Sequence, residues 1–117
     1  MKTHMDLDVW KKSMDFVEVI YKQSSSYPKE EIYGLTSQIR RAAVSVPSNI
    51  AEGAARQGNK EFIQFLYISL GSLSEVETQM MLAHRLGFAQ NIDILLSDIT
   101  RIKKMLNGLI VHLKGKL

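Results

Sequence analysis

Apolar side chains return every three to four residues along most of the chain, and this spacing constrains the fold more than any other feature. A period of 3.6 residues places such side chains on one face of an α-helix, whereas a strand needs strict alternation. Turn-forming residues at Tyr27-Pro28, Gly58-Asn59 and Gly87 divide the pattern into four segments. Four amphipathic helices joined by short turns predict an all-α, antiparallel up-and-down four-helix bundle, with residues 1–117 forming a single domain.

The phase of each segment predicts which side chains form the core, and local signals predict where the helices end. Pro28 suits the first turn of the second helix, Asn59 and Asn91 are candidate N-caps, and Gly87 is a candidate left-handed C-cap. The expected core stripes are Leu7, Trp10, Met14, Val17 and Tyr21; Ile32, Leu35, Ile39, Ala42 or Ala43, Val46 and Ile50; Phe62, Leu66, Ser69, Leu73, Val76, Met80 and Ala83; and Ile92, Leu95, Ile99, Ile102, Leu106, Leu109 or Ile110, and Leu113.

Further apolar residues lie outside these stripes and make the helices apolar over much of their circumference. Helices of this kind are usually more buried than the outer helices of a monomer, which favours self-association through helix faces. A thick monomer core with scattered exposed apolar residues is the alternative. The additional residues are Val9, Phe16, Val19 and Ile20; Ile63, Phe65, Tyr67, Ile68 and Leu70; and Ile94, Leu96 and Ile110.

Composition and spacing argue against catalysis and metal binding. The chain has no cysteine, which excludes disulfides, iron–sulfur clusters, thiolate zinc sites and a cysteine nucleophile. None of His4, His84 and His112 completes a Glu-x-x-His pair, and there is no phosphate-binding glycine loop or GxSxG turn. We therefore expect no enzymatic activity, no cofactor and no metal. The start of the chain lacks an apolar signal segment and no run is long enough to cross a membrane, so we expect a cytoplasmic protein.

The stretch RRAAVSVPSNIAEG, residues 40–53, places a proline within an otherwise helical pattern. Pro47 cannot donate to the carbonyl of Ala43, so we expect it to kink the second helix without ending it. The hydroxyls of Ser45 and Ser48 are suited to the freed backbone groups. A break before Pro47, with a new helix starting there, is the competing interpretation. A wholly polar stripe runs beside the core stripe and consists of Arg41, Ser45, Ser48, Asn49, Glu52 and Arg56.

The block QIRRAAVSVPSNIAEGAARQGNKEFIQFLYISLGSLSEVETQ resembles the signature of the four-helix proteins encoded in intervening sequences of bacterial 23S rRNA genes. The flanks LDVWKKSMDFVEVIYK and YPKEEIYGLTSQIRRA agree, so the resemblance covers nearly the whole chain. It implies a barrel-shaped homopentamer. The accessory variability determinant proteins of diversity-generating retroelements are similar, and their barrel binds nucleic acid and a reverse transcriptase. The chain departs at Gly58-Asn59, where the pattern more often has serine, which affects a cap only.

The charge of +3 is unevenly distributed, since residues 28–60 carry five basic and three acidic side chains and residues 92–117 five and two. The resemblance and the wide apolar stripes indicate a homo-oligomer, and together with these basic segments they predict a non-enzymatic protein that binds RNA or DNA mainly through phosphates. A scaffold for a protein partner, such as a reverse transcriptase, without intrinsic nucleic-acid affinity is the alternative. The arginines would then pair with acids at subunit contacts, with Pro47, Ser48, Asn49 and Glu52 as interface or structural residues. The candidate nucleic-acid contacts are Arg40, Arg41, Arg56, Lys60, Arg101, Lys103 and Lys104.

Overall fold

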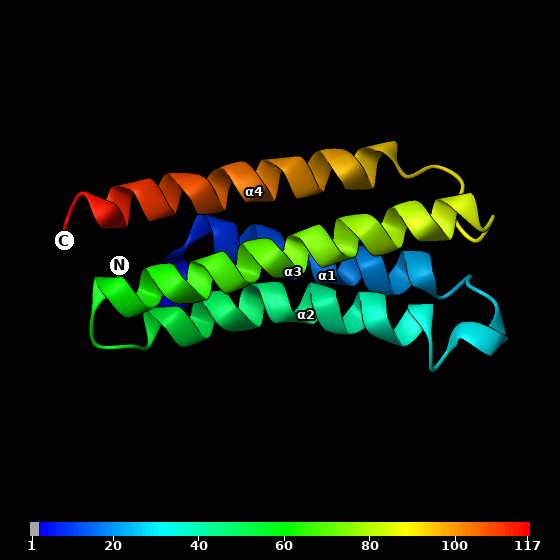
Figure 1. The fold of residues 1–117 in the computed structure, drawn as a ribbon, viewed down its shortest axis with the longest axis horizontal. Coiled ribbons are helices and arrows are strands. Elements are labelled where there is room, and N and C mark those ends of the chain that lie inside the picture. Colours follow the sequence, from blue (N-terminus) through cyan, green and yellow to red (C-terminus); the bar gives the residue numbers. More distant parts are fainter. Residues whose placement is uncertain (1–2) are drawn as a thin grey trace.

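The computed structural model describes residues 3–117 and confirms the expected all-α fold with four long helices. No strand occurs within these residues, and successive helices run in opposite directions along a bundle of 46 × 24 × 19 Å (Figure 1). The helices are α1 (Asp8–Ser24), α2 (Leu35–Ala54), α3 (Asn59–Arg85) and α4 (Asp93–Lys114), with short 3-10 helices η1 (His4–Asp6) and η2 (Lys29–Glu31).

Each long helix packs against its two neighbours in the order α1, α2, α3, α4 and back to α1. The α2–α3 contact is the most extensive, and α2 and α4 occupy opposite corners of the bundle. The core stripes expected for the third and fourth helices are confirmed: each expected position is buried, with Ile110 and not Leu109 turned fully inward. The side chains of Ile39, Leu66 and Ile99 are wholly inaccessible at the centre of this core.

The core stripe expected for the first helix is correct only in part, because Leu7, Trp10 and Val17 are half-buried at the edge of the core and the fully buried stripe lies about one position away. Val9, Ser13, Phe16 and Ile20 face the core, whereas Met14 and Tyr21 are each 43% exposed. Helix α1 carries two neighbouring apolar stripes, and the stripe that faces the core also includes a serine. The Ser13 hydroxyl donates to the Val9 carbonyl at 2.7 Å, so the helix itself satisfies this polar group and allows its burial.

The predicted helix starts also need correction. Helix α2 begins at Leu35, so Ile32 lies outside it and is 56% exposed, and Pro28 precedes η2. The Glu31 carboxylate accepts from the Leu35 backbone N–H at 3.1 Å and so satisfies one of the free donors at this helix start. Glu31 lies four positions before Leu35, so the usual rule of a Ser, Thr, Asp or Asn directly before the helix does not predict this cap.

The asparagines expected as N-caps do not fill these positions. Gly58 precedes α3 and Ile92 precedes α4, and neither helix start has a side-chain cap hydrogen bond. The glycine expected to end α3 is confirmed, because Gly87 has φ +81°, in the left-handed region. The Phe88 N–H then donates to the Ala83 carbonyl at 2.8 Å, which closes the helix end.

Helix α2 passes through Pro47 without interruption, so the interpretation of a break is wrong, while the size of any kink stays a prediction. The Ser45 hydroxyl bonds with Ser72 at 2.8 Å and does not satisfy the carbonyl of Ala43. Ser69 donates to the Val46 carbonyl at 2.9 Å, which adds a second polar link from α3 to α2. Small residues at the contact allow these short distances and bring the two helices close together.

Candidate nucleic-acid interface

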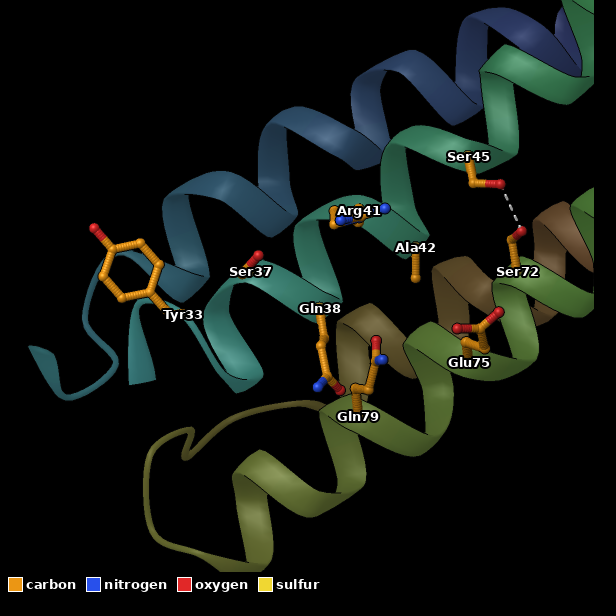
Figure 2. Close-up of a pocket in the computed structure, with 9 residues that line it drawn as sticks. All are labelled: Tyr33, Ser37, Gln38, Arg41, Ala42, Ser45, Ser72, Glu75 and Gln79. Carbon is orange, nitrogen blue, oxygen red and sulfur yellow. Dashed lines mark hydrogen bonds between the residues drawn. The ribbon is translucent and has the colours of Figure 1, made fainter. Parts of the chain in front are cut away.

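A polar groove of about 410 Å³ lies between α2 and α3 (Figure 2). It begins beside the loop that precedes α2 and follows the contact between the two helices toward the middle of the bundle. We call it the α2–α3 groove. Its lining consists of Tyr33, Ser37, Gln38, Arg41, Ala42, Ser45, Ser72, Glu75 and Gln79.

Hydrogen bonds fix the inner end of the α2–α3 groove. The Asn49 side-chain amide donates to both the carbonyl and the hydroxyl of Ser45, each at 2.8 Å. Ser45 in turn bonds with Ser72 across the two helices. Because this network joins α2 to α3, the two walls of the groove are held at a defined separation.

Two opposite charges line the α2–α3 groove, Arg41 on α2 and Glu75 on α3. Both side chains are exposed, and neither forms an ion pair with any of residues 3–117. Arg41 was predicted as a site residue, but Glu75 was not singled out. The available signal was the spacing of Ser72, Glu75 and Gln79, which places three polar groups on one face of α3 next to its core stripe.

Gln79, which lines the α2–α3 groove, has a buried acceptor. Its Oε1 atom is inaccessible and, within residues 3–117, is the one buried side-chain atom without a hydrogen-bond partner. A buried polar atom left unpaired costs about 1–3 kcal/mol. Figure 2 shows Gln38 and Gln79 extending into the α2–α3 groove from facing helices. Residues 3–117 therefore leave the hydrogen-bonding capacity of this acceptor, on a side chain that lines the groove, unfilled.

Three of the predicted nucleic-acid contacts are engaged within the molecule. The Arg40 guanidinium donates to the Ser24 hydroxyl at 2.9 Å and the Tyr21 carbonyl at 3.2 Å, and it lies over the Tyr21 ring. Arg56 pairs with Glu52 at 3.0 Å and lies over an aromatic ring of α3. Lys103 pairs with Glu77 at 3.1 Å. The Arg40 and Lys103 contacts join neighbouring helices, whereas the Arg56–Glu52 pair lies along α2.

The remaining predicted contacts are exposed and lie on separate surfaces. Lys60 is in the first turn of α3, while Arg101 and Lys104 lie one turn apart on the outer face of α4. None of them forms an ion pair with residues 3–117. Because α2 and α4 occupy opposite corners, Arg41 and the α4 pair point to different sides of the bundle. The seven predicted residues therefore do not form one continuous patch.

The four residues predicted as interface or structural positions have different surroundings. Pro47 is buried within α2, and Asn49 belongs to the network at the inner end of the groove. Glu52 forms the exposed pair with Arg56. Ser48 is exposed beside α1. Asn49 thus stabilises the α2–α3 contact, and Ser48 is available to a partner.

An apolar groove of about 510 Å³ between α1 and α2 was not predicted. Trp10, Met14 and Val17 of α1 line it opposite Val44 and Pro47 of α2, and Trp10 and Val17 also pack against the edge of the core. We call it the α1–α2 groove. Exposed apolar surface of this kind often marks a protein–protein contact. The wide apolar stripes of the sequence indicated that some apolar surface would stay exposed. They did not indicate which face of α1 would be exposed.

The buried phenol of Tyr27 has a shifted pKa. Burial raises the pKa of Tyr27 above its usual value of 10.0, while the hydrogen bond from its hydroxyl to Gln23 at 2.8 Å acts in the opposite direction. Within residues 3–117, no three His, Asp or Glu side chains are grouped to hold a metal ion. No helix among these residues is long and apolar enough to span a membrane.

The fold and its two grooves define a four-helix-bundle protein with one polar and one apolar surface beside α2. The sequence model of the family described as 23S rRNA-intervening sequence protein matches residues 5–108. The chain therefore belongs to that family. A comparison with curated proteins finds no match.

Proposed function

We propose that this protein is a non-enzymatic, cytoplasmic homo-oligomer that binds RNA through contacts with phosphates. The charge of α4 carries the proposal. Beyond Asp98 this helix and the residues that follow it contain five basic side chains and no acid. Arg101 and Lys104 present their charges on its outer face without pairing within the described chain. The family's description, which names the 23S rRNA, favours RNA as the nucleic acid.

Contacts with phosphates require positive charge at the surface and little base reading, and α4 meets that requirement. Side chains three positions apart on a helix lie within one turn, so Arg101 and Lys104 can contact neighbouring phosphates. Lys103 already neutralises Glu77 and contributes less. An oligomer repeats the pair on each subunit, so several weak contacts add to one stable complex.

The α1–α2 groove supports self-association. Its exposed Met14 and half-buried Trp10 leave apolar surface uncovered in the single chain. Helix α4 lies at the corner opposite α2, so subunits that meet on the α2 side leave Arg101 and Lys104 accessible. Light scattering should give several times the monomer mass of 13.3 kDa. Met14→Glu should lower that mass, whereas Met81→Glu, an equal change at an exposed position outside the groove, should not.

Fluorescence anisotropy with single- and double-stranded RNA at about 50 mM salt tests the proposed function. We expect binding by the wild type and a strong loss of affinity in the double variant Arg101→Glu/Lys104→Glu. The matched control is Lys29→Glu/Arg85→Glu, which makes the same charge change at exposed positions away from the outer face of α4. Absence of binding by the wild type, or an equal loss in the control, would reject the proposal.

A scaffold function is the second candidate, and the α1–α2 groove favours it, because the same apolar surface fits a helix of a different protein. The anisotropy experiment separates the two candidates. A protein that is oligomeric and folded but binds no RNA at low salt would support the scaffold function.

A further inference from the structure

Within residues 3–117, the α2–α3 groove contains three polar side chains with bonding capacity left unused. Arg41 and Glu75 face it with opposite charges and no ion pair, and the buried Oε1 of Gln79 has no donor. The ring of Tyr33, which is 95% exposed, stands at one end. Such a groove fits a flat ligand that offers donors on one edge and acceptors on another.

We propose that the α2–α3 groove binds a guanine base, either unpaired in RNA or in a free nucleotide; the RNA form rests on the proposed function. Guanine carries two adjacent N–H donors, at N1 and at its amino group, and two acceptors, O6 and N7, on a different edge. A carboxylate only accepts and a guanidinium only donates. Glu75 therefore matches the donor edge, and Arg41 matches O6 and N7, its most common partners on a base.

The other bases fit these charges less well. Adenine and cytosine place their amino donor beside a ring nitrogen that accepts, and uracil places a single N–H between two carbonyls. Each of these edges would set at least one acceptor against the Glu75 carboxylate. Only guanine offers two neighbouring donors to this acceptor-only group. The charge on Glu75, which would oppose simple phosphate binding, is thus an advantage for binding this base.

Two further residues support an unpaired base. The Gln79 side chain lines the groove, and rotation of its amide on ligand binding would bring Oε1, which is buried without a partner among residues 3–117, to an N–H of the ligand. Unpaired bases in RNA complexes commonly stack on exposed aromatic rings, and Tyr33 offers such a ring beside the groove. Stacking on Tyr33 adds affinity for any base, so selectivity must come from Glu75, Arg41 and Gln79.

Calorimetric titration with GMP and AMP, and anisotropy with oligouridylates that carry one central guanosine or one central adenosine, test this inference. We expect GMP to bind in preference to AMP, and the guanosine oligonucleotide to bind at least about fivefold more tightly than its adenosine counterpart. Glu75→Gln should remove both preferences, because it replaces one acceptor oxygen by a donor. Glu61→Gln is the control, with the same change at an exposed position of α3 outside the groove.

Gln79→Met provides a second variant that keeps the side-chain length and removes the orphaned acceptor. It should weaken guanine selectivity while the protein stays as stable as the wild type or gains stability, since the unpaired atom is gone. Equal affinity for guanine and adenine ligands, or loss of selectivity in Glu61→Gln as large as in Glu75→Gln, would overturn the inference.

The nucleotide and oligonucleotide titrations also distinguish the guanine site from the proposed phosphate contacts of α4. Binding of RNA without preference for any base would leave phosphate contact standing and overturn the guanine site. Selective GMP binding without binding of any oligonucleotide would support the site as one for free nucleotides, and the RNA proposal alone would fail.

Discussion

Gly53 allows the close approach of α2 and α3, and replacing it with alanine tests that contact. A Cβ atom at this position would lie 2.7 Å from the Cβ of Phe65 and 3.0 Å from a ring carbon of Phe62. Real Cβ contacts are not this short, and the Phe65 Cβ is fixed to the α3 backbone. The substitution therefore has to push the two helices apart or shift one along the other.

The size of the effect follows from two opposing terms. Overpacking a core by one methyl group costs about 1–3 kcal/mol, and a clash with a backbone-fixed atom falls at the upper end of that range. Alanine gains up to about 1 kcal/mol over glycine within a helix. We expect Gly53→Ala to lower the free energy of unfolding by about 1–2 kcal/mol, and each kcal/mol to lower Tm by about 4 °C or more.

Thermal and urea unfolding followed by circular dichroism measure this change. Gly71→Ala is the control, because an alanine Cβ there meets no atom within 4 Å and should raise stability through helix propensity alone. A Gly53→Ala variant as stable as the wild type would refute the close-contact argument.

Three further changes test other parts of the account. Arg40→Ala should reduce the free energy of unfolding by about 1–2 kcal/mol, because it removes two hydrogen bonds to α1. Arg41→Ala should change the free energy of unfolding by less than about 0.5 kcal/mol. Equal effects of the two substitutions in urea unfolding would contradict the assigned contacts. Gly87→Ala should cost about 1–2 kcal/mol because its φ is +81°, and an unchanged Tm would argue against that conformation. Burial raises the pKa of Tyr27 above its ordinary value of 10.0, so the stabilisation from the neutral phenol is present below that pH and is lost as pH rises through the higher pKa of the folded state. Urea unfolding at about pH 8 and about pH 11 should therefore show a smaller loss of unfolding free energy in Tyr27→Phe than in the wild type.

The sequence was sufficient for the helical fold and for the core faces of α3 and α4. Their expected core positions recur at a period of 3.6 and are all buried, although further apolar side chains such as Ile68 and Ile94 lie exposed on the same helices. Helix α1 has two neighbouring apolar stripes, and periodicity alone did not decide which of them faces the core. The stripe that faces the core includes Ser13, whose hydroxyl is satisfied by the Val9 carbonyl of its own helix and can therefore be buried.

The surfaces were harder to predict because they depend on which helices meet. The α2–α3 groove requires Arg41 to face Glu75 and Gln79, which are more than thirty positions away in the chain. The two neighbouring arginines also lie on different sides of α2, because Arg40 contacts α1 and Arg41 lines the α2–α3 groove. A difference of one position along a helix rotates a side chain by about 100°, and only the packing of α1 against α2 decides which arginine remains free.

The salt dependence of RNA binding tests the central claim, that α4 contacts phosphates, most directly. Each neutralised phosphate contributes about 0.7–0.9 to the slope of log affinity against log salt concentration. The wild type should show a steep negative slope, and Arg101→Ala/Lys104→Ala should reduce its magnitude by about 1.5. Lys29→Ala/Arg85→Ala should leave the slope unchanged. A wild-type slope near zero, or equal slopes in the wild type and the α4 variant, would contradict the account.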